Sequence, residues 1–209
     1  SNNSISLAST GTSTSLPFPN LGDFKCEMVY DSAEMAEFFG PQNTYIGPQG
    51  THKIQAGAIT QIRFPVAANI TNSTRNRVVI KMRNVDNDFS FNQNNDFTSD
   101  FQKLVYDSSL VITQNAQTLG TINLQDTFFY AGKGLGITIY CDNTSNDPTP
   151  VNVRMINAYQ QGTPQVLRKG SLKKGYNATD GFDVFGSFFV NGEFDMNRPN
   201  FTLRANANA

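Results

Sequence analysis

His52 is the only histidine in the chain, so it is the one imidazole that could act as a general base. It lies in the segment GPQGTHK, and no nucleophile-elbow glycine pattern occurs near it. A solvent-facing loop histidine is favoured, with a Ser-His-Asp triad assembled from distant residues as the open alternative. Asp180 and Asp183 are neighbouring carboxylates, but not in a recognisable hydrolase arrangement. We therefore expect no enzymatic activity, no catalytic residue and no cofactor.

The segment Gly132-Lys133-Gly134-Leu135-Gly136 has the composition of a phosphate-binding loop. It has neither the Walker spacing nor the dinucleotide G-x-G-x-x-G spacing, and it joins two expected strands instead of a strand and a helix. Glycines that permit a tight turn explain the segment better. No phosphate site is expected.

Two acidic segments contain candidate calcium ligands, because carboxylate oxygens are what calcium prefers. Neither segment has the central glycine and the terminal glutamate of an EF-hand loop, so solvated loops are favoured and no metal site is expected. The residues concerned are Asp86, Asp88 and Asp96 in the first segment, and Asp142 and Asp147 in the second.

One basic cluster lies in the segment VLRKGSLKKG and contains Arg168, Lys169, Lys173 and Lys174. A hairpin with charged outer positions accounts for it, and such charges also discourage edge-to-edge aggregation. The alternative is a surface for an acidic partner, such as the Asp-rich segment 86–100 of a neighbouring copy. The first twenty residues contain no Lys or Arg and the net charge is −1, so we expect no direct binding of nucleic acid. No apolar run is long enough to span a bilayer.

The composition favours strands over helices. Hydrophobic residues make up 38% and charged residues 16% of the 209 residues, and Asn, Ser and Thr, which disfavour helix interiors, are abundant. Phe occurs 17 times and Trp is absent, so Phe and aliphatic residues must fill the core. Cys26 and Cys141 are too few for a disulfide framework. Buried free thiols are favoured, with one bridge between them as the alternative.

The segment from Thr118 to Cys141 is expected to form a central antiparallel hairpin. Two apolar runs, Leu119–Tyr130 and Leu135–Cys141, flank a short glycine-containing connector. In the second run Ile137 and Ile139 alternate with polar positions, the period-two pattern of a half-buried strand.

The remaining chain predicts shorter strands and one helix. Asp31–Gly40 has an N-cap, a capping-box Glu and a Gly-Pro stop, and is expected to be a helix that covers one end of the sheets. Further strands are expected at Ile54–Phe64, Arg77–Val85, Phe101–Ile112, Val151–Ala158, Val166–Leu172 and Phe182–Phe194, with a short edge at Phe201–Leu203. In Arg77–Val85 the residues Val78, Ile80 and Met82 should face inward, and NITNSTRN before it should be a polar loop. The predicted fold is all-β, an antiparallel β-sandwich or jelly roll of roughly 8–10 strands with one short helix and extended termini.

Both ends of the chain are polar. Residues 1–20 are a Ser/Thr/Asn-rich arm that cannot order itself by burying its own surface, so a neighbouring subunit is expected to hold it. Residues 201–209 form a similar tail, and residues 21–200 are expected to be one domain. The candidates for subunit contacts are Leu7, Leu16, Phe18, Phe89, Phe91, Phe97, Arg168, Lys169, Lys173, Lys174 and Phe201.

In its general character the chain resembles jelly-roll capsid and capsid-decoration proteins of viruses and bacteriophages: all-β, Asn/Thr-rich, near-neutral, with polar arms. The resemblance implies a virion structural protein made in the host cytoplasm, which packs against copies of itself and other virion proteins. The alternative is a receptor- or carbohydrate-binding head, in which Tyr45, Tyr159 and Tyr176 would offer aromatic faces beside amide groups.

Overall fold

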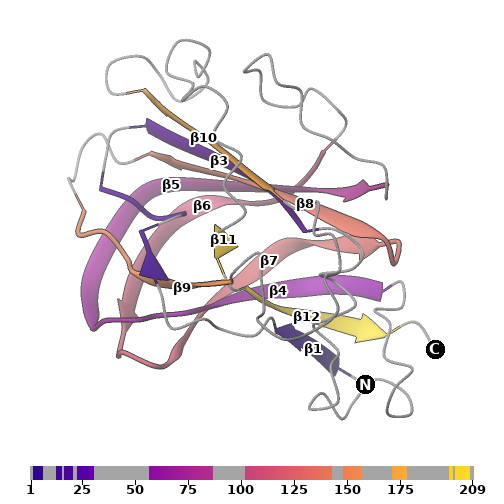
Figure 1. Ribbon diagram of the computed structural model, residues 1–209, viewed down its shortest axis with the longest axis horizontal. Helices are drawn as coiled ribbons and strands as arrows, with labels where there is room; N and C mark the ends of the chain where they lie inside the picture. Colours follow the sequence, from indigo (N-terminus) through magenta and orange to yellow (C-terminus); the bar gives the residue numbers. More distant parts are fainter. Residues whose placement is uncertain are drawn as a thin grey trace, which may run out of the picture.

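The computed structural model describes residues 2–6, 13–15, 17–20, 23–30, 57–86, 102–142, 148–156, 171–177, 198–199 and 201–207. Within these ranges every regular element is a strand, which confirms the all-β prediction (Figure 1). The expected helix at Asp31–Gly40, the strand at Phe182–Phe194 and the acidic segment after Asp86 lie outside the described residues.

Two antiparallel sheets make up most of the described chain (Figure 1). The four-stranded sheet has the order β1 (Asn2–Ser6), β12 (Thr202–Ala207), β4 (Gly57–Pro65) and β7 (Leu119–Tyr130). The five-stranded sheet has the order β10 (Ser171–Asn177), β3 (Asp23–Tyr30), β8 (Gly134–Asp142), β5 (Ile70–Val85) and β6 (Lys103–Gln114). A small third sheet has the order β11 (Arg198–Pro199), β9 (Val153–Ile156) and β2 (Ser13–Thr14).

The strand pairs of the two large sheets are nested along the sequence. The innermost pair is β5 with β6, followed outward by β4 with β7, β3 with β8, and β1 with β12. Successive pairs in this series belong to alternate sheets. Further ladders, β12 with β4 and β8 with β5, then join the pairs within each sheet.

The hydrophobic core lies between the two large sheets, because one buried cluster contains side chains of both. Val78, Ile80 and Met82 of β5 are fully buried in it, as the alternation in the sequence predicted. Ile62 of β4 and Ile122 of β7 enter the same cluster from the other sheet. This two-layer arrangement is that of a β-sandwich. Cys26 and Cys141 are also buried here as free thiols, as expected.

The predicted central hairpin was half wrong. Strands do occupy its two apolar runs, but β7 pairs with β4, whereas β8 pairs with β3 and β5. The connector, in which Gly132 has a φ of 89°, therefore carries the chain from one sheet to the other. Ile137 and Ile139 are buried as expected, but Thr138 on the opposite face is only 2% exposed. A glycine turn between two strands indicates where the chain reverses, and does not indicate which sheet it returns to.

Two smaller expectations were also wrong. NITNSTRN is not a loop, because β5 already begins at Ile70 and irregularities in its ladder with β6 accommodate the polar residues. One of them, Asn72, has a φ of 48°. The predicted edge strand at Phe201–Leu203 belongs to β12, which lies inside its sheet between β1 and β4.

Candidate interaction surface

Among the side chains whose burial the structure describes, the exposed large apolar ones all lie on β6 and β7. These strands are the outer members of the two sheets, and they lie next to each other at one side of the sandwich. The residues are Leu104 (47% exposed) and Val111 (57%) on β6, and Leu119 (43%) and Phe129 (66%) on β7. Single exposed apolar side chains are ordinary on a protein surface, whereas their restriction to two neighbouring strands indicates a contact surface.

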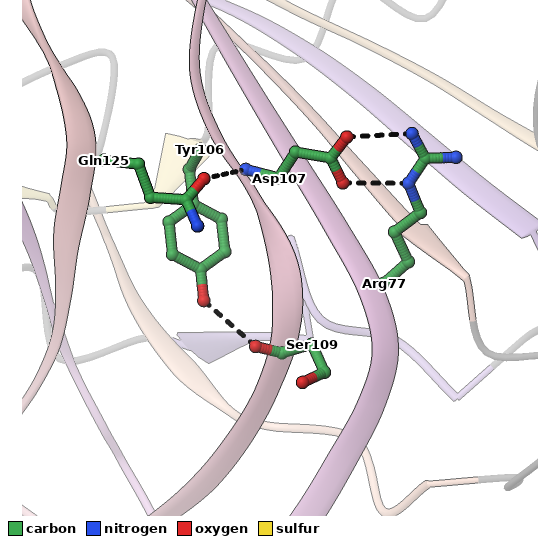
Figure 2. Close-up of polar contacts among 5 residues, drawn as sticks. All are labelled: Arg77, Tyr106, Asp107, Ser109 and Gln125. Atoms are coloured by element: carbon green, nitrogen blue, oxygen red, sulfur yellow. Dashed lines mark hydrogen bonds and ion pairs between the residues drawn. The ribbon is translucent and has the colours of Figure 1, made fainter.

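Side chains cap the backbone between these two strands. Gln125 Oε1 accepts a hydrogen bond of 2.7 Å from the backbone N–H of Asp107, as Figure 2 shows. Lys103 Nζ donates a 2.7 Å hydrogen bond to the carbonyl oxygen of Thr127. A backbone group that already has a partner is unavailable to a strand from another chain. At these positions the surface therefore offers side chains, not an open ladder.

The charges of the surface balance each other. Arg77 of β5 forms a bidentate ion pair with Asp107 of β6, with both N–O distances at 2.9 Å (Figure 2). The hydrogen bond from Arg77 holds the pKa of the Asp107 carboxyl below its usual value. Lys103 and Asp126 form a looser pair at 3.5 Å. Two cations and two anions leave no net charge to repel an identical surface.

The end of β7 is held in a defined position, which presents Phe129. Asn84 of β5 donates a 3.2 Å hydrogen bond to the carbonyl oxygen of Phe129 and accepts one of 2.8 Å from the N–H of Ala131. Lys103 Nζ lies 5.8 Å from the centre of the Phe129 ring, a cation–π distance. Contacts within the chain thus fix the backbone on either side of the exposed ring and place an ammonium group beside it.

A second feature is the anchor of the N-terminal segment, which consists of residues 17–20 bound to Arg75. Phe18 is fully buried, and its ring centre lies 5.2 Å from that of Phe64. Arg75, also fully buried, donates hydrogen bonds of 3.0 Å to the carbonyl oxygens of Phe18 and Thr149, and another to that of Pro19. Burial lowers the pKa of the Arg75 guanidinium from its usual value.

Two further bonds complete the anchor. The N–H of Val151 donates to the Phe18 carbonyl at 3.1 Å, and the thiol of Cys141 donates to the Pro17 carbonyl at 3.3 Å. Burial also raises the pKa of the Cys141 thiol to about 12, so the thiol keeps its proton and remains a donor at neutral pH. The chain is therefore fixed to the core at residues 17–20.

A buried layer of charged residues covers the outer face of β3, β8 and β5. Glu27 is 1% and Arg83 7% exposed, and their side chains meet at 3.4 Å. Gly136 of β8 lies under Arg83, since a Cβ at Gly136 would come within 2.8 Å of Arg83 Cγ. Lys25 lies 4.5 Å from the Tyr140 ring centre, and burial lowers the pKa of its ammonium to about 8, which Glu27 partly opposes.

The structure describes four of the eleven predicted contact residues. Phe18 and Phe201 are 0% and 2% exposed, so both belong to the core of their own chain in this conformation. Lys173 and Lys174 lie on β10, at the outer edge of the five-stranded sheet. The others lie outside the described residues: Leu7, Leu16, Phe89, Phe91, Phe97, Arg168 and Lys169.

Sequence reasoning missed the four apolar residues of β6 and β7. A signal was present in β7, where Leu119 and Phe129 occupy odd-numbered positions while the buried Ile122 and Phe128 occupy even-numbered ones. The sequence analysis expected a central hairpin in this stretch and did not assign the residues of Leu119–Tyr130 to one face or the other.

Among the described residues, no three His, Cys, Asp or Glu side chains form a group that could hold a metal ion. In the same part of the chain, no helix has the length and apolar character to cross a membrane. Searches found no matching family model, curated protein or solved structure.

Proposed function

We propose that the protein is a structural subunit of a virus or bacteriophage particle, which acts by packing against copies of itself. The observation that carries the proposal is the set of exposed apolar side chains on β6 and β7. Burying a fully exposed side chain of this kind contributes roughly 1.5–3 kcal/mol, so covering the exposed half of each of these contributes about half of that. Several of them covered at once, repeated over many subunits, give a stable assembly from individually weak contacts.

We further propose that the fold is a jelly roll, and the nested strand pairs support this. Eight strands taken in chain order are β1, β3, β4, β5, β6, β7, β8 and β12. Their ladders join the first to the eighth, the second to the seventh, the third to the sixth and the fourth to the fifth. A long hairpin rolled up in this way distributes alternate pairs to two sheets, which is the arrangement of a jelly roll.

The side-chain hydrogen bonds to the backbone of β6 and β7 favour specific side-chain contacts over unlimited strand addition. A free edge of the length of β6 or β7 would invite strand addition from any chain. The bonds from Gln125 and Lys103 obstruct such addition between the two strands. Contacts through Leu104 and Phe129 then depend on matching side chains, which makes them specific to a partner.

A carbohydrate- or receptor-binding head is the second candidate, and Phe129 favours it. Its ring is 66% exposed, and Lys103 and Asp126 lie nearby. An aromatic face beside charged groups can stack on a sugar and bind its hydroxyls. Jelly rolls also occur in lectins. Binding of the purified chain to a glycan panel, lost in Phe129→Ala, would favour this function.

The test of the proposed function is the solution mass of the chain by light scattering over a range of concentrations. We expect the mass to rise with concentration for the unmodified chain, and to stay near that of one chain for a Leu104→Asn/Phe129→Ser variant. The matched control is Leu104→Met/Phe129→Leu, which keeps the surface apolar and should still associate. A chain that stays monomeric at every concentration would contradict the proposal.

A further inference from the structure

The weakest attachment in the described part of the four-stranded sheet is that of β1. It is an outer strand, and its ladder with β12 has five residue pairs, from Asn2↔Asn206 to Ser6↔Thr202. The sequence of β1 is NNSIS, with one apolar residue. The backbone hydrogen bonds of such a ladder contribute little net stability by themselves, because water replaces them when the strand leaves.

Among the described residues that follow β1, the firmest attachment is that of residues 17–20. Between β1 and this anchor, the described chain has one other ladder, the two residue pairs of β2 with β9. At the anchor, Phe18 is fully buried and Arg75 binds its carbonyl oxygen. An arm with a fixed base and a weakly held end can leave its own sheet without disturbing the core.

The place that β1 leaves fits an identical strand. Without β1, β12 becomes the outer strand and presents the backbone groups that β1 had paired. A β1 strand from a second copy has the same residues and makes the same ladder. Exchange of an identical element between copies costs little for this reason.

We propose that β1 is exchanged between subunits, so that Asn2–Ser6 of one copy completes the four-stranded sheet of another. Reciprocal exchange gives a closed dimer, and exchange in one direction links subunits into rings or longer arrays. The inference rests on the proposed function as an assembling subunit. It assigns the arm a role separate from that of β6 and β7, because β1 and β7 are at opposite edges of the sheet.

The experiment introduces one cysteine on each side of the ladder in the full chain, as Ser4→Cys/Arg204→Cys. Residues 4 and 204 are register partners, and opposite positions in an antiparallel ladder have Cα separations that a disulfide can bridge. The native thiols of Cys26 and Cys141 are buried and give a low background. The purified protein is oxidised and run on a denaturing, non-reducing gel, and the linked peptide is identified by mass spectrometry.

Exchange predicts covalent dimers or larger species joined through residues 4 and 204, which the single variants Ser4→Cys and Arg204→Cys do not form. A monomer with an internal disulfide between these positions would overturn the inference. The pair Asn3→Cys/Ala205→Cys is the second variant, because neighbouring pairs in the ladder differ in geometry. If neither pair of cysteines forms a disulfide, the inference is also overturned, because β1 would then not pair with β12 of any copy.

The light-scattering result separates the two proposals. Large assemblies that contain only internal disulfides would refute exchange and leave the contact through β6 and β7 in place. A monomeric chain with internal disulfides would refute both.

Discussion

Arg75 and Arg77 are separated by one residue on β5, yet their surroundings are opposite. Arg75 is fully buried and binds the carbonyl oxygens of the N-terminal anchor. The side chain of Arg77 is 47% exposed and is paired with Asp107. In a regular strand, residues two apart share a face. The ladder of β5 with β6 shifts register between Arg75 and Val78, and this bulge turns one arginine to the inside and the other to the outside.

The difference shows that position, and not residue type, decides what an arginine does for the protein. Removing a buried guanidinium that binds several carbonyl groups breaks several charge-assisted hydrogen bonds at once. An exposed ion pair contributes little, because water and salt replace it. We therefore expect Arg75 to determine stability and Arg77 to influence contacts with a partner.

The largest effect is expected for Arg75→Met. The carbonyl oxygens of Phe18, Pro19 and Thr149 each lose a hydrogen bond from the guanidinium, and a hydrogen bond to a charged group typically contributes about 1.5–3 kcal/mol. The free energy of unfolding in urea measures this loss. Arg75→Lys, which keeps the charge but not the branched donor, should lose an intermediate amount. Equal stability of the two variants would contradict the role given to the guanidinium.

A pair of truncations separates the anchor from the arm. Removing residues 1–20 deletes the buried Phe18 and should cost about 3–5 kcal/mol, as Phe→Ala does in a core. Removing residues 1–15 keeps the anchor and deletes the ladders of β1 and β2, which are the ladders described in that segment. We expect that loss to be below about 2 kcal/mol, since chain entropy offsets most of the hydrogen bonding. Similar urea midpoints for both truncated chains would show that Phe18 does not anchor the arm.

Lys25, in the buried charged layer, shows whether burial by itself changes what a cationic side chain contributes to stability, as it does for Arg75 and not for Arg77. Burial lowers the pKa of Lys25 to about 8 from an ordinary value of 10.5. Between these pH values the unfolded chain binds more protons than the folded one, so folding stability rises with pH. Compared with Lys25→Met, the unmodified chain should gain about 1–3 kcal/mol between pH 7.5 and 10.5. Urea midpoints of both proteins measure it, and since all other titrating groups are shared, parallel pH profiles would contradict the buried position of Lys25.

The smallest effect is expected for Arg77→Ala. The Arg77–Asp107 pair should contribute less than about 1 kcal/mol, as exposed pairs do. Because Arg77 lowers the pKa of Asp107, the contribution is present at neutral pH and is lost as the pH falls below about 4. Thermal unfolding at pH 7 and pH 3, with Asp107→Asn as the matched variant, measures it. A loss comparable to that of Arg75→Met would remove the distinction between the two arginines.

Local patterns in the sequence predicted many of the strands and their inward residues. The alternation of Val78, Ile80 and Met82 correctly gave one face of β5, and the apolar runs located β7 and β8. Pairing was not predictable in the same way. Partners such as Ile5 and Leu203 are distant in sequence, and no local pattern contains the information that joins them. The bulge after Arg75 could not be predicted for a related reason, since it depends on the register of β5 with β6.

The candidate surface was missed because its residues have the same character as core residues. Phe129 follows the buried Phe128 directly, and only the orientation of β7 in its sheet separates them. The anchor was missed because composition assigned residues 1–20 to one polar arm. Phe18 lies within that arm, flanked by Pro17 and Pro19, and its burial depends on Arg75, more than fifty residues away.

The nested pairs also order events while the chain is being synthesised. The innermost strands, β5 and β6, can pair early, whereas β1 must wait for β12, since Asn2 pairs with Asn206. At about 5–20 residues per second, that interval is roughly 10–40 s for each new chain. During this time β1 has no pairing strand in its own chain, while other copies are being synthesised on the same messenger RNA. The strand that is synthesised first is thus the last to find its partner in its own chain, and it waits while other growing copies are nearby.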